Sequence, residues 1–554
     1  MNFSKKILSQ TITQLCLAKE IDHIVISPGS RNAPLTVGFT EHPSFKNFSI
    51  VDERCAAFFA LGLAQQLKKP VALVCTSGSA LLNYYPAIAE AFYSDIPLVV
   101  ISADRPKAMI DIGDGQTIRQ EDVFSNHILY SANCLEGEEH QVFNETEINI
   151  ALNLAIELQG PVHINAPFSE PLYETVSDMQ VRPQQVPART ATRQFDEDLQ
   201  PFLKQWNNAK RKLILVGVLP PNSIEQQWID QLATDDSVLV FTETTSNLHH
   251  DNFISSIDQL IAPLQENGFS ELQPELLITM GGMVVSKKIK AFLRTYPPKH
   301  HWHVDPKKAY DTYFVLDHHF KTTPALFLKQ FLPKIEMAVS LYRTKWLEVK
   351  KNRLQKHTDF EAQASFSDFT VFSEIFKFIP DDLQLQLGNS ATVRYAQLFD
   401  LPKTLTVFCN RGTSGIDGST STAIGAAHAS ETPSVFVTGD LAFFYDSNAL
   451  WNNYIPSNFK IIVINNGGGG IFRILPGAKN TEHFSTYFET KHQLSATHLC
   501  EMFGFEYDSA TNKAEVKEAL MRFFNTSEGP KLLEIFTPSE SNDRVLLDYF
   551  KYIS

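Results

Sequence analysis

The sequence lacks three features that would each define a class of protein: paired cysteines, a long apolar run and an excess of basic charge. Its six cysteines are scattered without a CxxC pair, which argues against a zinc or disulfide framework and favours buried free thiols. No apolar run approaches the roughly 18 residues that a membrane-spanning helix requires. A formal net charge of -14 argues against a nucleic-acid or membrane-surface partner, because either would favour a basic face.

The N-terminal segment, residues 1–20, has neither a continuous apolar core nor a small-residue cleavage site. It is therefore predicted to be an amphipathic helix and not a signal peptide. Together with the lack of a spanning run, this predicts a cytoplasmic protein.

Short apolar runs alternate with helix-like segments through three parts of the 554-residue chain. Such alternation predicts an α/β protein with three doubly wound parallel-sheet domains, which we place at residues 1–175, 196–340 and 365–554. A proline-containing segment with little periodicity, residues 173–194, is expected to link the first two domains. The basic segment 342–357 is expected to be a solvated linking helix, with an interaction surface as the alternative.

Two polar pairs follow neighbouring strands of the third domain. The run SVFV leads into Gly439-Asp440, and KIIVI leads into Asn465-Asn466 and four glycines. Because the carboxyl ends of parallel strands meet at one edge of a sheet, Asp440 and Asn466 are expected to lie together there. One carboxylate, one amide oxygen and a backbone carbonyl suit Mg²⁺, and the glycines allow close approach of a diphosphate. Turn chemistry would explain either pair alone, so the joint pattern carries this prediction.

Four arginines stand at predicted loop or strand ends of this acidic protein. They are Arg31 in SPGSRNAPL, Arg105 in ADRP, Arg394 in GNSATVR and Arg411 in NRGTSGIDG, accompanied by Gln116 and Ser390. Each arginine alone is better explained as a surface or ion-pair residue. Together they suggest a substrate with several carboxylates, because a guanidinium binds a carboxylate through two parallel hydrogen bonds.

The run from 439 to 468 resembles the cofactor motif of the thiamine diphosphate-dependent enzymes. The resemblance implies that Asp440, Asn466 and the Gly468 carbonyl hold Mg²⁺ or Mn²⁺, with Gly439 beside the cofactor. The residue after the Asp is usually Gly in this motif, and here it is Leu441.

The resemblance extends to the residues that would touch the cofactor ring. Glu53 precedes a long apolar helix and matches the family's glutamate, which hydrogen-bonds the aminopyrimidine ring and is the catalytic residue. Stabilisation of a helix start is the alternative role for Glu53. Ile416 and Ile471 match apolar residues beside the cofactor, and Phe472 matches one that lines the substrate pocket. An ordinary core position is the competing explanation for these three.

The segments SPGSRNAPL, ADRP, GQTIRQ, GNSATVR, NRGTSGIDG, GDLAFFYD and NNGGGGIF together resemble one branch of the family. These are the carboligases of menaquinone biosynthesis, which decarboxylate 2-oxoglutarate and add the succinyl carbanion to isochorismate. The resemblance assigns Ser390, Arg394 and Arg411 to the 2-oxoglutarate-derived chain. It assigns Arg31, Arg105, Gln116 and a middle-domain base, Lys288 or its neighbour Lys287, to isochorismate. A Lys-Arg pair often stands at these lysines in the family.

The resemblance also implies the roles of the three domains and an oligomer. The first domain would bind the pyrimidine, the third would bind the diphosphate, and the second would lie between them in the chain. In this family the first domain of one subunit faces the third domain of another. We therefore expect at least a homodimer, and a homotetramer as the full assembly.

Two other functions remain open from the sequence. Another thiamine diphosphate-dependent 2-oxo-acid decarboxylase or an acetohydroxyacid synthase-like carboligase would share the cofactor motif. The first domain, however, has no adjacent His pair of the kind that simple decarboxylases use. A flavin or nicotinamide oxidoreductase is not expected, because GGMVVSK is only a weak Gly-rich loop and lacks GxGxxG.

Overall fold

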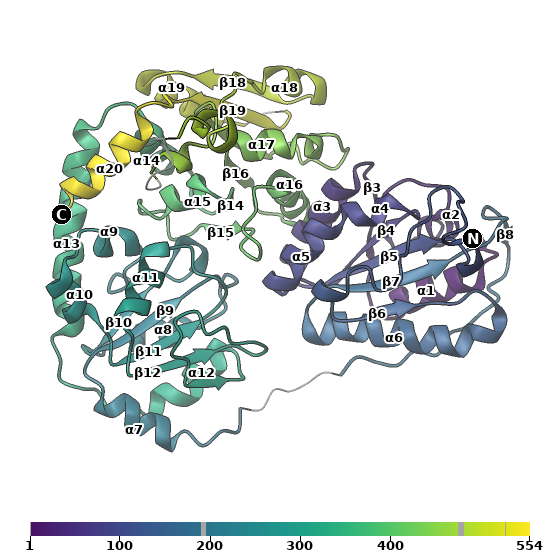
Figure 1. The fold of residues 1–554 in the computed structure, drawn as a ribbon, viewed down its shortest axis with the longest axis horizontal. Helices are drawn as coiled ribbons and strands as arrows, with labels where there is room; N and C mark the ends of the chain where they lie inside the picture. The colour runs from purple at the N-terminus through teal and green to yellow at the C-terminus, as the bar shows by residue number, and fades with distance from the viewer. Residues whose placement is uncertain (1, 190–194, 475–480, 527) are drawn as a thin grey trace.

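Three parallel sheets of six, five and six strands organise the computed structural model, which describes residues 2–189, 195–474, 481–526 and 528–554. Each sheet lies among its own helices (Figure 1). This is the predicted α/β architecture with three doubly wound sheets. No helix in the described ranges is long and apolar enough to cross a membrane.

The first sheet has the strand order β3-β2-β4-β5-β7-β6. Its strands are β2 (His23–Ile26), β3 (Lys46–Ser49), β4 (Val71–Cys75), β5 (Leu98–Asp104), β6 (Ser131–Asn133) and β7 (Val162–Pro167). The helices of this part are α1 (Ile7–Ala18), α2 (Ala33–Thr40), α3 (Glu53–Leu67), α4 (Ser79–Asn83), α5 (Tyr85–Ser94) and α6 (Gln141–Leu158). Along β4, Leu73 enters one hydrophobic core while Ala72 and Val74 enter another. Burial on both faces explains why this strand is a continuous apolar run.

The second sheet has the order β10-β9-β11-β12-β13. Its strands are β9 (Lys212–Val216), β10 (Val238–Phe241), β11 (Leu276–Met280), β12 (His300–Val304) and β13 (His318–Phe320). The helices are α7 (Gln200–Asn208), α8 (Gln226–Leu232), α9 (Ile257–Ile261), α10 (Glu266–Leu272), α11 (Lys287–Thr295) and α12 (Pro324–Phe331).

The third sheet has the order β15-β14-β16-β17-β19-β18. Its strands are β14 (Gln384–Leu387), β15 (Thr406–Cys409), β16 (Ser434–Gly439), β17 (Lys460–Asn465), β18 (Glu506–Ala510) and β19 (Lys531–Phe536). The helices are α14 (Asp368–Phe378), α15 (Ala391–Ala396), α16 (Ser419–Ala429), α17 (Asp440–Tyr445), α18 (Thr497–Phe503), α19 (Lys513–Phe523) and α20 (Asn542–Tyr552).

Two linking segments differ from their predictions. The segment 173–194 is not entirely irregular, because β8 (Thr175–Val176) pairs with β1 (Phe3–Ser4) in a small antiparallel sheet. The basic segment forms α13 (Tyr342–Gln363), which links the second and third sheets as expected but is not simply solvated. It buries Tyr342, Trp346, His357 and Phe360, whose spacing puts all four on one side of the helix.

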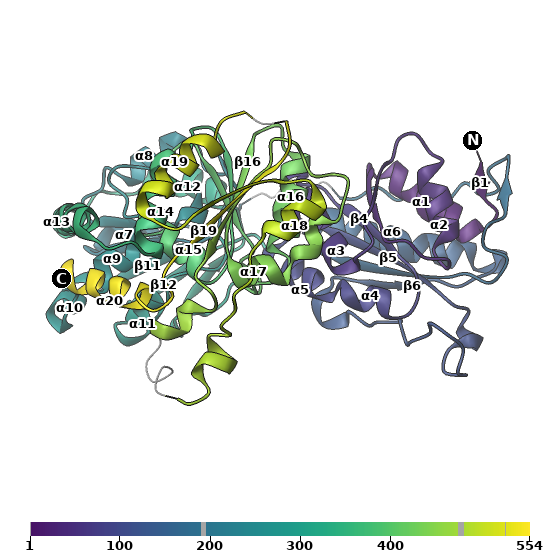
Figure 2. The same ribbon diagram turned by 90° about the horizontal axis from the view of Figure 1, so that it is seen from above.

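The first and third parts of the chain meet where α3 packs against α16 (Figures 1 and 2). Two glycines allow the backbones of these helices to approach closely. A Cβ at Gly62 would lie 2.1 Å from the Thr422 carbonyl oxygen, and one at Gly425 would lie 2.1 Å from the Phe59 carbonyl oxygen. Neither distance is sterically possible, so this contact requires glycine at both positions.

Candidate active site

The strand order brings the two predicted metal-binding side chains to one edge of the third sheet. β16 and β17 are adjacent parallel strands with Gly439 opposite Ile464, so Asp440 and Asn466 each follow the carboxyl end of a strand. Asp440 is buried at the start of α17, and its Oδ2 accepts a hydrogen bond from the Gly468 backbone N–H at 2.9 Å. The structure thus places Asp440 directly against the glycine loop.

The Asn466 amide has one satisfied end and one unsatisfied end. Its Nδ2 donates to Asp368 Oδ2 at 3.0 Å, whereas its Oδ1 is buried and has no hydrogen-bond partner among the described residues. A buried acceptor without a partner is costly in a folded protein. A metal ion bound to Asn466 Oδ1 would satisfy this oxygen. The unpaired oxygen is therefore consistent with the predicted metal site.

The glycine loop has a backbone conformation that other residues rarely adopt. Gly467 has φ of +72° and Gly468 has φ of +148°. A Cβ at Gly468 would also lie 2.5 Å from the Glu489 carbonyl oxygen. The conformation of the loop therefore requires glycine at both positions. In this conformation the Gly468 backbone lies within hydrogen-bond distance of Asp440.

The predicted donor set consists of one carboxylate, one amide oxygen and one carbonyl. Oxygen donors of this kind suit Mg²⁺ or Mn²⁺, which would complete their coordination with diphosphate oxygens and water. In the described part of the chain, no three His, Cys, Asp or Glu side chains converge to hold a metal. This absence does not test the predicted metal site, because that site has a single carboxylate and takes its other ligands from an amide and a backbone carbonyl.

His492 is a neighbour of this site that the sequence did not indicate. Its Nε2 lies 3.2 Å from Asp440 Oδ2, and its backbone N–H donates to the Gly467 carbonyl. The hydrogen bond with Asp440 raises the pKa of the His492 imidazole. A lone histidine far along the chain from Asp440 carried no signal of this contact.

Two predicted substrate arginines lie together beyond β14 and β15. Arg411 is buried, donates from NH1 to Asn389 Oδ1 at 2.7 Å, and has a buried Nε without a partner. Arg394 donates to the Ser390 carbonyl at 2.5 Å. Burial lowers the pKa of Arg394, and the positive charge of Arg411 lowers it further. Two adjacent guanidinium groups with a free donor form a site that attracts an anion.

Two polar side chains that the sequence did not indicate hold the loop after Arg411. Asn389 donates from Nδ2 to the carbonyls of Asn410 and Gly415, both at 2.7 Å. Glu90, buried on α5, accepts the N–H groups of Gly412 and Thr413, both at 2.6 Å. These contacts fix the backbone that carries Arg411 and the exposed Ile416.

Two polar residues of the second domain fix the position of α11, the helix that carries three lysines. Glu243 accepts hydrogen bonds from Val285 N–H at 2.7 Å and from Ser286 N–H at 2.8 Å, so it fixes the start of the helix. Burial raises the pKa of this carboxyl to about 7. The adjoining Asn247 exchanges two hydrogen bonds with the Val407 backbone, at 3.0 and 2.8 Å, and so attaches this segment to β15.

Lys290 of α11 interacts electrostatically with both arginines. Burial lowers its pKa, the neighbouring Glu243 opposes that effect, and the charges of Arg411 and Arg394 add to it. Within the described ranges, the side chain of Lys290 makes no hydrogen bond or ion pair. The predicted Lys288 instead lies with its Nζ 5.3 Å from the centre of the Phe550 ring, and Lys287 is exposed.

Other predicted residues lie at the carboxyl edge of the first sheet. Arg31 is buried, donates to the Phe168 carbonyl at 2.8 Å and pairs with Glu170 at 3.1 Å. Arg105 pairs with Asp114 at 3.1 Å, just before the exposed Gln116. Both arginines therefore have carboxylate partners that an anionic ligand would have to displace.

Glu53 is the first residue of α3, as predicted. The preceding Asp52 caps the helix by accepting the Cys55 N–H, and Glu53 Oε2 accepts a hydrogen bond from Asn83 Nδ2 at 3.2 Å. Asp52 therefore caps the helix, while Glu53, in the first turn, is still placed to interact favourably with the helix dipole.

The predicted site residues form two separate groups. The first-sheet group comprises Arg31, Glu53, Arg105 and Gln116. The third-sheet group comprises Ser390, Arg394, Arg411, Ile416, Gly439, Asp440, Asn466, Gly468, Ile471 and Phe472. Across the ranges the structure covers, no hydrogen bond or ion pair joins a residue of one group to a residue of the other. Glu53 and Asp440 therefore share no described hydrogen bond. The neighbours of Glu53 do bond to the third part of the same chain, because Asp52 accepts from Asn448 Nδ2 and Arg54 donates to the Tyr445 carbonyl, both at 2.8 Å.

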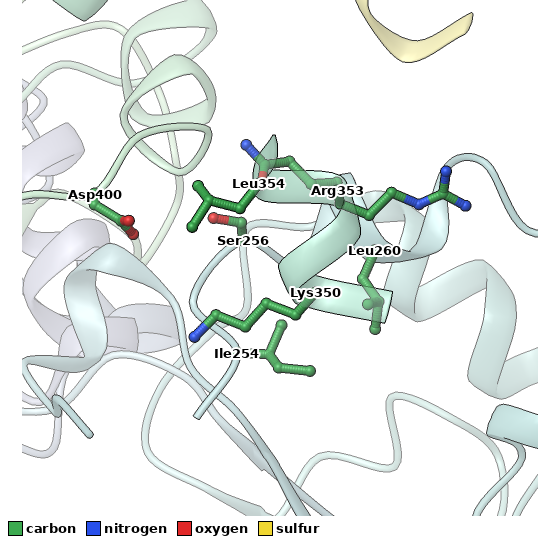
Figure 3. A pocket seen from close by; sticks show the side chains of 8 residues that line it. Ile254, Ser256, Leu260, Lys350, Arg353, Leu354 and Asp400 are labelled. Atoms are coloured by element: carbon green, nitrogen blue, oxygen red, sulfur yellow. The ribbon is translucent and has the colours of Figure 1, made fainter. Parts of the chain in front are cut away.

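A small cavity of about 20 Å³ lies away from both groups, between α9, α13 and Asp400 (Figure 3). Ile254, Leu354 and Lys350 line it. Lys350 donates to the Phe253 carbonyl at 2.8 Å, which gives this lysine a structural partner. None of the predicted site residues lines the cavity, so it is not the candidate active site.

Comparison with known families identifies the class of protein. Residues 7–127 match the N-terminal TPP binding domain of thiamine pyrophosphate enzymes, residues 184–387 match the middle domain, and residues 388–535 match the C-terminal TPP binding domain. The chain therefore belongs to the thiamine pyrophosphate enzymes, as its cofactor motif predicted.

Individual relatives narrow the class further. The chain is 58% identical to the 2-succinyl-5-enolpyruvyl-6-hydroxy-3-cyclohexene-1-carboxylate synthase of Flavobacterium psychrophilum and 56% identical to that of Christiangramia forsetii, with 100% of each chain covered in both comparisons. It is 38% identical to the synthase of Porphyromonas gingivalis, over 100% of this chain and 98% of that one. Within the thiamine pyrophosphate enzymes, the chain belongs to the family of these synthases.

Proposed function

We propose that the protein decarboxylates 2-oxoglutarate and adds the succinyl carbanion to isochorismate. The products are 2-succinyl-5-enolpyruvyl-6-hydroxy-3-cyclohexene-1-carboxylate and CO₂, in a cytoplasmic step of menaquinone biosynthesis. The observation that carries this proposal is the pair Arg394 and Arg411, with a buried and unpaired Nε on Arg411. Both substrates are dicarboxylates. Pyruvate has a single carboxylate, so a pyruvate-specific relative would not need the additional positive charge of Arg394 and Arg411.

The third-sheet group is suited to hold the cofactor through its metal. Asp440, Asn466 and the Gly468 carbonyl would bind Mg²⁺ or Mn²⁺ together with the diphosphate, and Gly439, Ile416 and Ile471 would lie beside the cofactor. When bound, thiamine diphosphate supplies the carbon nucleophile and stabilises the negative charge left by the loss of CO₂. Residues 365–554 would thus be the diphosphate-binding domain, residues 1–175 the pyrimidine-binding domain and residues 196–340 the middle domain.

The protein's own groups would bind, orient and move protons. Glu53 would exchange a proton with the aminopyrimidine ring. Ser390, Arg394 and Arg411 would hold the succinyl carboxylate, and Phe472 would exclude water from the pocket. Arg31, Arg105 and Gln116 would hold isochorismate after Arg31 exchanges Glu170 for a substrate carboxylate. Preorganised charge and placement would supply most of the rate enhancement.

We infer that each active site is shared between two copies of the chain. In the thiamine pyrophosphate enzymes the first domain of one subunit faces the third domain of another, and in the described residues Glu53 and Asp440 share no hydrogen bond. We therefore place each site between the first domain of one subunit and the third domain of another, in a homodimer that is part of a homotetramer. Isologous pairing of this kind gives two equivalent sites per dimer.

A donor test distinguishes this proposal from the nearest alternative. Purified protein with thiamine diphosphate and Mg²⁺ is given isochorismate and either 2-oxoglutarate or pyruvate, and the products are identified by mass spectrometry. The proposal predicts the succinyl product from 2-oxoglutarate and none from pyruvate. Turnover of pyruvate to acetolactate would instead identify an acetohydroxyacid synthase-like carboligase.

Lys290→Ala is expected to raise the KM for one of the two dicarboxylate substrates about 10- to 100-fold, because a charge-assisted hydrogen bond contributes about 1.5–3 kcal/mol. Lys329→Ala is the control, since Lys329 is an exposed lysine of α12 in the same domain with no assigned role. The measurement is steady-state kinetics with each substrate varied in turn. A larger effect from Lys288→Ala than from Lys290→Ala would restore the assignment made from the sequence.

A further inference from the structure

The orientation of the Asn466 amide decides whether this residue can bind a cation. The oxygen and nitrogen of an amide have similar sizes, and only the oxygen is a metal ligand. Asn466 Nδ2 donates to Asp368 Oδ2 at 3.0 Å, and Asn466 Oδ1 is buried without a partner. Gly470 leaves room for this arrangement, since a Cβ there would lie 3.2 Å from Asn466 Nδ2.

Asp368 is held firmly in the position from which it contacts Asn466. It is the first residue of α14 and is 3% exposed. Its Oδ1 accepts hydrogen bonds from Thr537 Oγ1 at 2.5 Å and from Asn542 Nδ2 at 2.9 Å, while its backbone N–H donates to Asn542 Oδ1. Burial raises the pKa of Asp368 to about 6, and the hydrogen bonds from Thr537, Asn466 and Asn542 oppose that rise. Three donors therefore surround one carboxylate, which is ionised at neutral pH.

An ionised carboxylate accepts hydrogen bonds and cannot donate them. Asp368 therefore accepts the NH₂ end of Asn466 and rejects its oxygen end, so the oxygen must face the other way. We propose that Asp368 is a positioning residue that fixes the Asn466 amide with its oxygen directed to the metal ion. This inference rests on the proposed metal site at Asp440, Asn466 and Gly468.

Asp368→Asn tests the inference with little change in shape. The introduced amide keeps an oxygen for Thr537 and Asn542 but presents its NH₂ group to Asn466. Asn466 must then rotate its oxygen toward position 368 and turn its own NH₂ group to the metal. We expect metal affinity to fall about 10- to 100-fold, the usual effect of losing a group that orients a ligand.

The direct readout is Mn²⁺ binding, measured from the electron paramagnetic resonance signal of free Mn²⁺ in chelator-treated protein with saturating thiamine diphosphate. Thr537→Val is the matched control, because it removes another hydrogen bond of Asp368 without touching Asn466. The control is expected to bind Mn²⁺ within threefold of the unmodified protein. Asp368→Asn binding Mn²⁺ as tightly as this control would overturn the inference.

An exchange variant keeps the test decisive if the single variant does not fold. Asp368→Asn combined with Asn466→Asp restores the hydrogen bond with its direction reversed, and a carboxylate presents oxygen on either side. The exchange is expected to recover Mn²⁺ binding to within about threefold, and Asn466→Asp with Asp368 intact is the control for the charge that the new carboxylate adds at the metal site. An exchange variant that folds and binds as weakly as the single variant, or that binds no Mn²⁺, would overturn the proposal.

The unmodified protein separates this inference from the proposed function. If it binds no Mn²⁺ in the presence of thiamine diphosphate, the metal site itself is wrong. If it binds Mn²⁺ and Asp368→Asn binds equally well, the metal site stands and only the role of Asp368 fails.

Discussion

Glu53→Gln is expected to lower kcat at least ~100-fold and to leave the fold intact, because proton transfer by a positioned side chain contributes about 10²–10⁴-fold. Gln has the size of Glu and can still accept the hydrogen bond from Asn83, but its amide neither gains nor loses a proton near neutral pH. The measurement is steady-state CO₂ release from 2-oxoglutarate with isochorismate present. Circular dichroism and thermal unfolding check the fold.

The matched control for Glu53 is Glu266→Gln. Glu266 is also the first residue of a helix, α10, and is exposed. If Glu53 only stabilised a helix start, both variants would show the same small loss of stability and unchanged kcat. A Glu53→Gln variant with the kcat of the unmodified protein would remove Glu53 from the mechanism.

Asp440→Asn is expected to abolish turnover by a different route, through loss of the metal and with it the diphosphate. The variant removes the only carboxylate in the predicted donor set while keeping the shape of the side chain. Thiamine diphosphate binding, followed by quenching of protein fluorescence, should no longer depend on Mg²⁺. Mg²⁺-dependent binding equal to that of the unmodified protein would contradict the metal assignment.

Mixing the two inactive variants tests whether the site is shared between subunits. Asp440→Asn and Glu53→Gln subunits are dissociated, combined in equal amounts and reassembled. Half of the resulting pairs are mixed, and each mixed pair contains one site with both residues intact, so about a quarter of the original activity should return. A site within one chain predicts no recovery at all. Each variant reassembled alone is the control.

The central strands of the fold could be predicted because burial on both faces demands continuous apolar runs. The strands β3, β6, β13 and β18, which are not marked by long apolar runs, are edge strands of the three parallel sheets. β3 has the sequence KNFS and exposes two of its four residues. Edge strands have backbone partners on one side only and tolerate polar residues, so they carry little hydrophobic signal.

The position of Asp440 and Asn466 could also be predicted, because parallel strands fix which chain segments meet at the carboxyl edge. Their supporting residues could not. Asp368 lies 98 residues from Asn466, and Glu90 lies 322 residues from Gly412. An acidic residue at a helix start already has a local explanation in the helix dipole, which hides a role for Asp368 in orienting another side chain.

The sequence could not show which lysine of α11 faces the two arginines. The predicted Lys288 was chosen by matching a pair of basic residues, whereas the structure brings the charge of Lys290 to the two arginines. Helical geometry separates the directions of residues two positions apart, so a match along the sequence does not fix which lysine faces the pocket. Substrate kinetics of the lysine variants will decide between them.

The account as a whole is tested most directly by CO₂ release from 2-oxoglutarate by metal-free apoprotein. Thiamine diphosphate, Mg²⁺ and isochorismate are supplied together and then omitted one at a time. The account predicts full turnover only when all three are present, and the succinyl product in equal amount to CO₂. Release of CO₂ at the full rate without isochorismate would identify a simple decarboxylase and contradict the roles of Arg31 and Arg105.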